Sequence, residues 1–155
     1  MITFFETYQC KADAKGRISL PSGLKNILND VLAEGLVLKR SVFKPCIELY
    51  PMSEWKMILE KMSKLSQFNR KNLDFIRRFT ADVKVVDVDN AGRFLIPKHL
   101  FDFAQLDKDV VLASTITFIE IWDKNLYEQD INSLDETEFM RLTEEIMGNH
   151  ADELS

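Results

Sequence analysis

The chain contains one nine-residue pattern twice, and this duplication constrains its fold more than any other feature. "DAKGRISLP" occupies residues 13–21 and "DNAGRFLIP" occupies residues 89–97. The identical pairs are Asp13 and Asp89, Gly16 and Gly92, Arg17 and Arg93, and Pro21 and Pro97. An internal repeat of this kind indicates that one structural unit occurs twice in the chain.

The similarity continues downstream of the motif. "EGLVLKR" (34–40) corresponds to "KDVVLAS" (108–114), and "CIELYPMSEW" (46–55) corresponds to "FIEIWDKNLY" (118–127). The offset between equivalent residues falls from 76 to 74 to 72, which places short deletions in loops of the second copy. The sequence therefore predicts a first unit at 3–52, a helical insert at 53–80, a second unit at 81–124 and an acidic helical tail at 125–155.

Each unit is predicted to contain two strands, a short helix and two further strands. A strand reaches the Asp, the Gly suits a left-handed turn position, and a second strand runs from the Arg to the Pro. The Pro is well placed in the first turn of the short helix. Such a small unit buries little apolar surface alone, so the two copies are expected to pack as an intramolecular pseudo-dimer in one α+β domain, mostly β.

The insert and the tail are predicted to be helical. Apolar residues recur at helical spacing from Trp55 to Leu65, with Ser53 as the expected N-cap, and a second helix begins near Asn69. In the tail, the expected caps and stop are Asp123, the capping box Asp135 with Glu138, and Gly148. The stripe Phe139, Leu142, Ile146 and Met147 is expected to pack on the core or on another subunit.

Composition excludes several classes of protein. No apolar run approaches a membrane span, and the N-terminus lacks the pattern of a secretory signal, so a cytoplasmic location is expected. Cys10 and Cys46 form no CxxC pair, and His99 and His150 are equally isolated. We therefore expect free thiols, with no metal site and no other cofactor.

Charge is distributed unevenly along the chain. The net charge is −5, which argues at first against a nucleic-acid partner. Residues 1–50 carry seven Lys or Arg against five Asp or Glu, and residues 51–80 carry seven against three. Residues 81–122 carry four against seven, and residues 123–155 carry two against ten. The N-terminal half is thus basic, and the tail is strongly acidic.

The repeated Asp-x-x-Gly-Arg pattern has three possible roles. It can be a local turn in which the Asp caps the backbone and pairs with the Arg. It can instead present Arg17 and Arg93 to a polyanion, since a guanidinium donates two parallel hydrogen bonds to phosphate or guanine. Catalysis is the weakest reading, because no second titrating group is duplicated: Ser19 corresponds to Leu95, and His99 to Gly23. We therefore do not expect an enzyme.

These motifs resemble the two halves of the MraZ family of bacterial transcriptional regulators. The resemblance rests on the two nine-residue patterns, each followed by a short helix and a strand pair ending in "IELYP" or "IEIWD", and it extends from about Thr3 to the C-terminal helix. It implies two intertwined SpoVT-AbrB-type swapped-hairpin units that form a pseudo-dimeric barrel. It also implies a ring-like homo-oligomer that binds repeated boxes in promoter DNA and represses the division and cell-wall gene cluster on the nucleoid.

The resemblance assigns the motif role residue by residue. Arg17 and Arg93 are the implied DNA contacts, and the implied orienting residues are Asp13, Gly16, Asp89 and Gly92. Charge alone adds the lysines near each motif to the DNA-binding candidates, namely Lys11, Lys15, Lys25 and Lys98. Because three of these lysines belong to the first copy, we expect the first repeat to bind phosphate more strongly than the second.

Three alternatives remain open at the level of sequence. The chain could use its duplicated fold only for assembly, without binding DNA. It could also be an AbrB-like regulator or antitoxin with different operators. The Lys and Arg residues of the insert, between Lys56 and Arg78, are favoured as the solvated face of a helix over a DNA contact.

Overall fold

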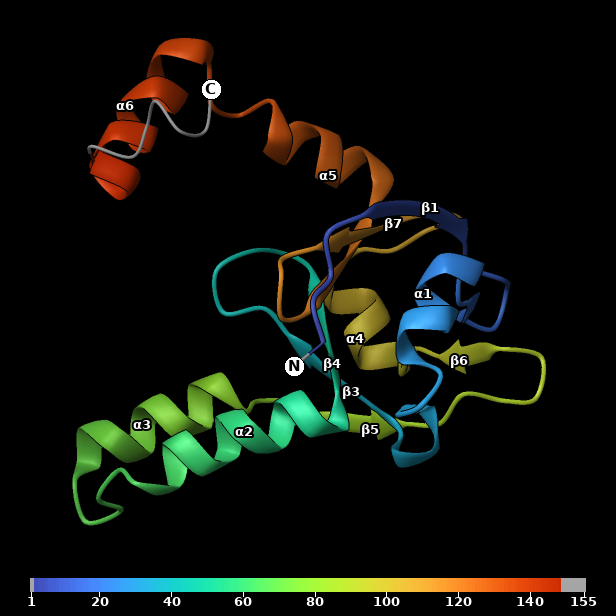
Figure 1. The fold of residues 1–155 in the computed structure, drawn as a ribbon, viewed down its shortest axis with the longest axis horizontal. Coiled ribbons are helices and arrows are strands. Elements are labelled where there is room, and N and C mark those ends of the chain that lie inside the picture. Colours follow the sequence, from blue (N-terminus) through green and yellow to red (C-terminus); the bar gives the residue numbers. More distant parts are fainter. Residues whose placement is uncertain (1, 149–155) are drawn as a thin grey trace. The chain divides into compact units, whose positions relative to one another are not determined.

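The computed structural model describes residues 2–148, so the predicted roles of His150 and of the last residues of the tail lie outside the described part. The chain divides into two compact units, residues 1–124 and residues 125–155, and each is described by itself. Figure 1 shows the elements of both units.

The first unit contains all the strands of the described residues. They are β1 (Thr7–Lys11), β2 (Arg17–Ser19), β3 (Leu36–Arg40), β4 (Ile47–Pro51), β5 (Lys84–Val86), β6 (Arg93–Leu95), β7 (Asp109–Ser114) and β8 (Ile119–Asp123). Its helices are α1 (Ser22–Leu28), the 3₁₀ turn η1 (Leu32–Glu34), α2 (Met52–Ser63), α3 (Arg70–Phe79) and α4 (Lys98–Phe103). The predicted order of two strands, a short helix and two strands is confirmed in both copies.

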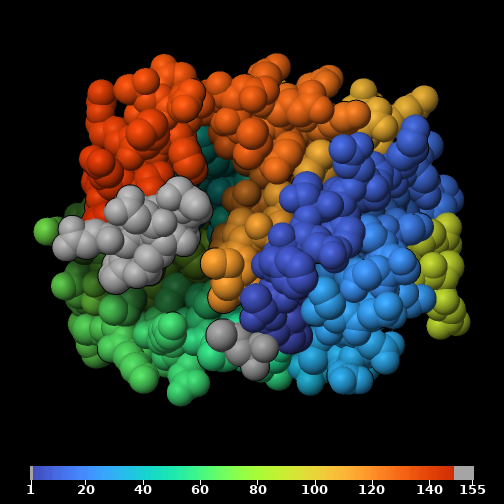
Figure 2. Space-filling view, turned by 45° about the horizontal axis from the view of Figure 1, so that its top comes forward, coloured from blue at the N-terminus to red at the C-terminus, as the bar shows by residue number. Residues whose placement is uncertain are grey.

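The two copies share one antiparallel sheet of order β1-β7-β8-β4-β3-β5. The first strand of each copy pairs with a strand of the other copy: β1 pairs with β7, and β5 pairs with β3. The central contact between β4 and β8 joins equivalent strands, with Glu48 opposite Glu120. Neither copy could therefore form its part of the sheet alone. In the space-filling view, the N-terminal segment and β1 lie along the surface, as expected of an edge strand (Figure 2).

The prediction of a closed barrel was wrong. The edge strands β1 and β5 lie at opposite ends of the sheet and do not pair. After each of them the chain turns at once, through its Asp-x-x-Gly turn, into β2 or β6, and these two strands pair with each other in a separate two-stranded sheet. This second sheet, with α1 and α4, covers the apolar face of the large sheet. The core is therefore covered by the small sheet and the two helices, and the large sheet stays open.

The central strands are buried on both faces. One face carries Leu38, Leu49 and Ile121 and packs in the main core with Ile18 and Phe94 of the small sheet. Because side chains alternate along a strand, the neighbouring residues Val37 and Tyr50 point to the other face, where Trp55 of α2 covers them. The aromatic residues Tyr50, Trp55 and Trp122, predicted to lie in a core or interface, are each at most 5% exposed.

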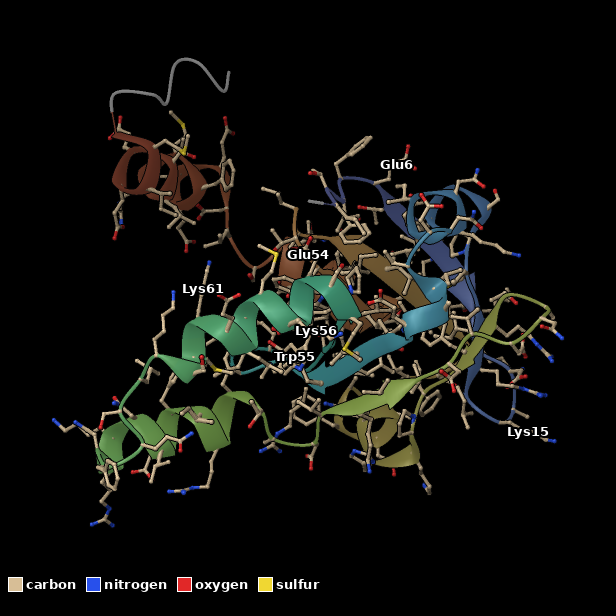
Figure 3. The ribbon with its side chains drawn as sticks, turned by 60° about the horizontal axis from the view of Figure 1, so that its bottom comes forward. Glu6, Lys15, Glu54, Trp55, Lys56 and Lys61 are labelled. Atoms are coloured by element: carbon tan, nitrogen blue, oxygen red, sulfur yellow. The ribbon has the colours of Figure 1, made fainter. Side chains whose placement is uncertain are left out.

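The α2–α3 hairpin is the predicted insert, shown with its side chains in Figure 3. The prediction of Ser53 as N-cap was wrong, because α2 begins at Met52 and the N-cap position belongs to Pro51, whose ψ of 146° is still extended. Helix α3 begins near Asn69, as predicted. Asn69 is its N-cap, because Asn69 Oδ1 accepts a hydrogen bond from Lys71 N at 2.9 Å. The Trp55 and Phe79 rings stack at 6.1 Å, which holds the two helices against the sheet.

The second unit contains α6 (Glu136–Met147) and all but the first residue of α5 (Lys124–Ile131), a helix that begins directly after Asp123. Asp135 caps α6 by accepting from Glu138 N at 2.8 Å, and Gly148 ends it with a φ of +55°, both as predicted. Across residues 2–148, no helix combines the length and the apolar character that crossing a bilayer requires.

One lysine is fully buried beneath the α2–α3 hairpin. Lys39 Nζ lies 3.2 Å from Glu48 Oε1, donates to Arg40 O at 2.9 Å and sits 4.6 Å from the centre of the Phe79 ring. The Tyr50 hydroxyl donates to the same Glu48 oxygen at 2.9 Å. Burial, reinforced by the Glu48 charge, raises the pKa of Tyr50, so this hydroxyl stays protonated and keeps donating.

We expect Glu48→Ala to reduce the free energy of unfolding strongly, by about 3 kcal/mol, because it leaves the Lys39 ammonium buried without its carboxylate. Glu48→Gln retains a carbonyl oxygen that can accept from Lys39 and Tyr50, so it should cost clearly less. Urea unfolding of the two variants measures the difference. Equal losses would mean that the charge pair contributes nothing beyond packing.

Candidate nucleic-acid interface

The first Asp-x-x-Gly-Arg segment is a tight turn organised by one carboxylate. Asp13 Oδ1 accepts hydrogen bonds from Lys15 N and Arg17 N, both at 2.9 Å. Asp13 Oδ2 accepts from Arg17 Nε at 2.9 Å. Gly16 N closes the turn onto Asp13 O at 3.0 Å. The carboxylate therefore fixes the backbone of the turn and the direction of the arginine together.

The second segment repeats these contacts. Asp89 Oδ1 accepts from Ala91 N and Arg93 N, both at 2.9 Å, and Oδ2 accepts from Arg93 Nε at 3.1 Å. Gly92 N bonds to Asp89 O at 2.9 Å. The local-turn interpretation is thus confirmed in both copies. It does not exclude a binding role, because each arginine uses only its Nε in these contacts.

Glycine is required at both turns. Gly16 has a φ of +87° and Gly92 a φ of +77°, in the left-handed region that side-chain-bearing residues enter at a cost. A Cβ at Gly16 would also lie 3.4 Å from Ile96 O. The predicted orienting role of these two residues therefore has a backbone cause.

Strands β2 and β6 form a ribbon with local pseudo-twofold symmetry. Ile18 pairs with Phe94, its equivalent in the second repeat. On one side of this pair Arg17 lies opposite Leu95, and on the other side Arg93 lies opposite Ser19, the equivalent of Leu95. The ladder continues symmetrically on both sides, through Leu20 N to Gly92 O at 2.9 Å and Ile96 N to Gly16 O at 3.0 Å. The pseudo-twofold axis therefore passes through the pairing of Ile18 with Phe94.

Both arginines lie on the exposed face of this ribbon. Ile18 and Phe94 are buried below it, so the alternate residues Arg17 and Arg93 share the opposite face. They are diagonal neighbours, which places their side chains on the order of 7–8 Å apart at the Cβ atoms. Within the described part of the chain, their terminal nitrogens make no hydrogen bond or ion pair to another residue. Two oriented guanidinium groups are thus open to a ligand.

The turn also holds its carboxylates in the charged form. The backbone N–H of Arg17, with the Arg17 side chain and Lys15 N, lowers the pKa of Asp13 to about 2. The Arg93 backbone N–H, followed by its guanidinium charge, lowers the pKa of Asp89 below the ordinary value in the same way. Both carboxylates therefore stay charged at neutral pH.

The four candidate lysines occupy different surroundings. Lys15 extends from the first turn (Figure 3). Lys25, assigned to the first copy from sequence, lies over the second turn instead: its Nζ is 3.2 Å from where a Cβ of Gly92 would be. Lys11 pairs with Asp109 at 3.7 Å, and Lys98 Nζ pairs with Asp102 at 3.0 Å. Among residues 2–148, each turn therefore has one lysine beside it that is not committed to an ion pair.

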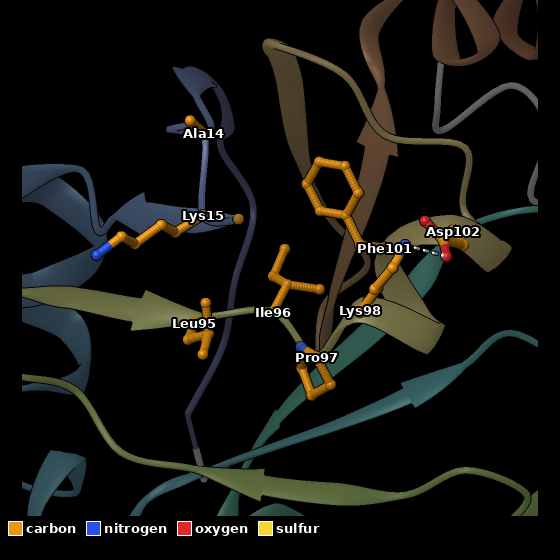
Figure 4. Close-up of a pocket in the computed structure, with 9 residues that line it drawn as sticks. Ala14, Lys15, Leu95, Ile96, Pro97, Lys98, Phe101 and Asp102 are labelled. Atoms are coloured by element: carbon orange, nitrogen blue, oxygen red, sulfur yellow. Dashed lines mark hydrogen bonds and ion pairs between the residues drawn. The ribbon is translucent and has the colours of Figure 1, made fainter.

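Phe101 is the residue that sequence reasoning missed. It is the equivalent of Lys25 at the 76-residue offset, and its ring lies over Gly16, 3.5 Å from where a Cβ would be. With Lys15 and Leu95 it lines an open cleft of about 410 Å³ between the first turn and α4 (Figure 4). The repeat offset was the available signal, since the sequence alone equates Lys25 with Phe101.

The remaining candidate chemistry is limited. Cys10 and Cys46 are free, and burial raises the pKa of Cys10 to about 11 and raises that of Cys46 further. Among the residues that the structure describes, no three side chains of His, Cys, Asp or Glu gather closely enough to hold a metal ion.

Comparison with known proteins accounts for the duplication. A family described as "MraZ protein, putative antitoxin-like" matches residues 3–78 and again residues 80–149. The chain belongs to the MraZ family. It is 53% identical to the transcriptional regulator MraZ of Flavobacterium psychrophilum, over 99% of this chain and 97% of that one. The corresponding protein of Christiangramia forsetii is 52% identical over 96% of each chain, and that of Bacteroides thetaiotaomicron is 36% identical over 96% and 95%. Each MraZ match contains one of the two Asp-x-x-Gly-Arg turns.

We expect an NMR titration of the Asp13 carboxyl to give a midpoint near 2, well below the ordinary 3.8. Because the folded-state pKa is lowered, this group stabilises the fold above pH 3.8, and the contribution is lost as the pH falls through 2. Arg17→Gln should raise the midpoint only partly, since the Arg17 backbone N–H is the largest cause and remains. A wild-type midpoint at 3.8 would contradict the geometry of the turn.

We expect Gly16→Ala to lower the free energy of unfolding by about 1–3 kcal/mol, because it forces a Cβ into a left-handed conformation. Gly23→Ala in α1 is the matched control. A Cβ there would meet Tyr8 at an ordinary 3.5 Å, and alanine favours a helix by up to about 1 kcal/mol. Chemical denaturation should give opposite signs for the two variants, and equal effects would count against the turn requirement.

Proposed function

We propose that this protein is a sequence-specific transcriptional regulator that contacts double-stranded DNA through the β2–β6 ribbon. The observation that carries the proposal is the pair Arg17 and Arg93, each held at Nε by its own aspartate and open at its terminal nitrogens, on one exposed face. The relatives named above are called transcriptional regulators, which supports the same conclusion.

The ribbon suits the DNA major groove, which admits a two-stranded β-ribbon as well as a helix. An arginine can donate two parallel hydrogen bonds to guanine O6 and N7 or to a phosphate. Because each aspartate already fixes its arginine, less side-chain entropy is lost on binding. The exposed Leu95, beside Arg17 in the ladder, offers an apolar contact of the kind that a thymine methyl group accepts.

We propose further that the protein recognises short repeated boxes upstream of the division and cell-wall genes, represses them, and assembles into a ring. This part rests on the resemblance to the MraZ family. The exchange of β1 and β5 between the two copies supports the intertwined, swapped-hairpin arrangement that the resemblance implies. A ring also lets an acidic protein hold DNA, because many weak sites act together on one footprint. The protein would act in the cytoplasm on the nucleoid, without a cofactor and without catalysis.

The lysines change the expected balance between the repeats. Lys15 lies on the first turn and Lys25 over the second, so each motif has one ammonium group. Lys11 and Lys98 are already paired with Asp109 and Asp102 and would contribute less to DNA binding. The stronger first repeat expected from sequence loses this support. We propose instead that the two motifs contribute about equally.

We expect Arg17→Ala and Arg93→Ala each to weaken binding to the gene's own upstream DNA by about tenfold or more, and by similar factors. Lys56→Ala on α2, which removes an exposed cation outside both the ribbon and the groove, is the control and should bind as the wild type. Lys15→Ala and Lys25→Ala should each reduce the slope of log affinity against log salt by about 1. Fluorescence anisotropy over a salt series, with a scrambled duplex for comparison, measures all of these.

The same titrations separate the alternatives. No binding at low salt would favour a protein that only assembles. Equal binding to its own upstream DNA and to the scrambled duplex would favour a regulator or antitoxin with different operators. A flat salt titration, or an unchanged affinity in the double arginine variant, would contradict the proposed contact.

A further inference from the structure

An aromatic groove lies on the face of the large sheet that is turned away from the β2–β6 ribbon. It has a volume of about 490 Å³ and runs between the β3–β4 loop and α3. Its apolar lining consists of Val42, Phe43, Tyr50, Phe75, Phe79 and Phe118. Phe43 is 89% exposed and Phe75 51% exposed, so large apolar side chains at the rim face solvent. Nothing in the proposed DNA contact uses this surface.

Helix α6 in the second unit carries an exposed apolar stripe. Phe139, Leu142 and Ile146 recur at spacings of three and four and therefore share one side of the helix. Phe139 is 60% exposed and Ile146 68% exposed. Glu138 and Glu145 lie along one edge of this stripe, and Glu136 lies along the other. Apolar anchors at this spacing are how an amphipathic helix binds a hydrophobic groove.

The two parts of the chain that carry these surfaces also have opposite net charge. Residues 125–155 contain nine acidic residues and one basic residue, a net charge of −8, which leaves +3 on residues 1–124 of the total of −5. Lys44 and Arg78 line the groove together with the carboxylates Glu48 and Glu120. The excess of positive charge comes from α3 beside the groove, which carries Arg70, Lys71 and Arg77 against the single acidic residue Asp74. Opposite charges around an apolar contact favour encounter and fix its orientation. The groove therefore fits an acidic amphipathic helix, which this chain itself supplies.

We propose that α6 of one copy docks its Phe139, Leu142 and Ile146 side into the aromatic groove of a second copy. Every copy carries both surfaces at different places, so the contact is heterologous, and such contacts close into rings when the rotation permits. This inference deepens the assembly part of the proposed function and rests on it, but does not depend on DNA binding. It commits to a second copy of the chain as the occupant.

Docking would also place the acidic segment away from the DNA-contacting face. The groove shares its sheet face with Tyr50, whereas Ile18 and Phe94 of the ribbon pack in the core on the other face, with Leu38 and Leu49. In the receiving copy, the bound α6 and the ribbon arginines are therefore separated by the sheet. The acidic charge would be held where it repels phosphate least.

The first test is the mass of the assembly in solution, measured by light scattering after gel filtration. The wild type should be an oligomer, and Ile146→Glu and Phe75→Glu should each shift it toward the monomer. Thr137→Glu, which adds the same charge to α6 away from the apolar stripe, should leave the mass unchanged. Circular dichroism shows whether each variant is folded. A monomeric wild type, or folded stripe and groove variants with unchanged mass, would overturn the proposal.

The second test identifies the occupant by disulfide cross-linking. A tagged chain with Phe139→Cys, mixed with an untagged chain with Phe75→Cys and oxidised with diamide, should give a covalent heterodimer. Phe68→Cys, at a fully exposed position in the α2–α3 loop, replaces Phe75→Cys in the control and should not cross-link. If one chain with both cysteines closes on itself and no heterodimer forms, the groove holds its own helix and the proposal is wrong.

The outcome is independent of the DNA result. The double variant Arg17→Ala, Arg93→Ala should assemble like the wild type. Ile146→Glu should still bind DNA as a single copy, but without the higher affinity that an oligomer gains from several sites. Loss of assembly and loss of DNA contact are therefore measured separately.

Discussion

The pairing of Ile18 with Phe94 is the interaction on which the rest of the structure depends. These residues are equivalent in the two repeats, pair directly with each other and are buried against the large sheet. Their backbone contact fixes the register of the ribbon, and the register fixes Arg17 and Arg93 as diagonal neighbours on the outer face. A slip by one residue would turn both arginines toward the core and both apolar side chains toward solvent. The core thus sets the geometry of the binding surface.

The Asp-Arg pairs orient the arginines toward DNA but add little net positive charge. A carboxylate at 2.9–3.1 Å offsets much of its arginine's attraction for a distant phosphate, so the pair contributes little long-range charge. What it contributes is a guanidinium already pointed at its target. Net attraction has to come from the lysines beside the turns and from several copies acting together. The overall charge of −5 is therefore compatible with a polyanion as partner.

The sequence predicted the elements well and their association poorly. Duplication and periodicity correctly predicted the strands, the short helices, the start of α3 near Asn69, the Asp135 cap and the left-handed glycines, all of which depend on local chemistry. Pairing between β1 and β7 joins residues about a hundred positions apart, and no local pattern encodes it. The same cause misplaced Lys25, which reaches the second turn only because the copies are interleaved. The prediction of a barrel was wrong because the β2–β6 ribbon covers the core, so the edge strands β1 and β5 do not pair.

The two faces of the large sheet differ in a way that suits two different partners. The face under the ribbon packs Leu38 and Leu49 against Ile18 and Phe94 in the main core, which holds the ribbon at a fixed place. The face under the groove carries the Lys39, Glu48 and Tyr50 cluster, whose polar atoms bond to one another. Such a cluster tolerates only the arrangement in which all its partners are satisfied, so it fixes the Tyr50 and Phe79 rings that floor and flank the groove. A preformed groove lowers the entropy lost when a helix binds to it. The sheet can therefore carry the DNA-binding arginines over one face and bind α6 of a second copy on the other.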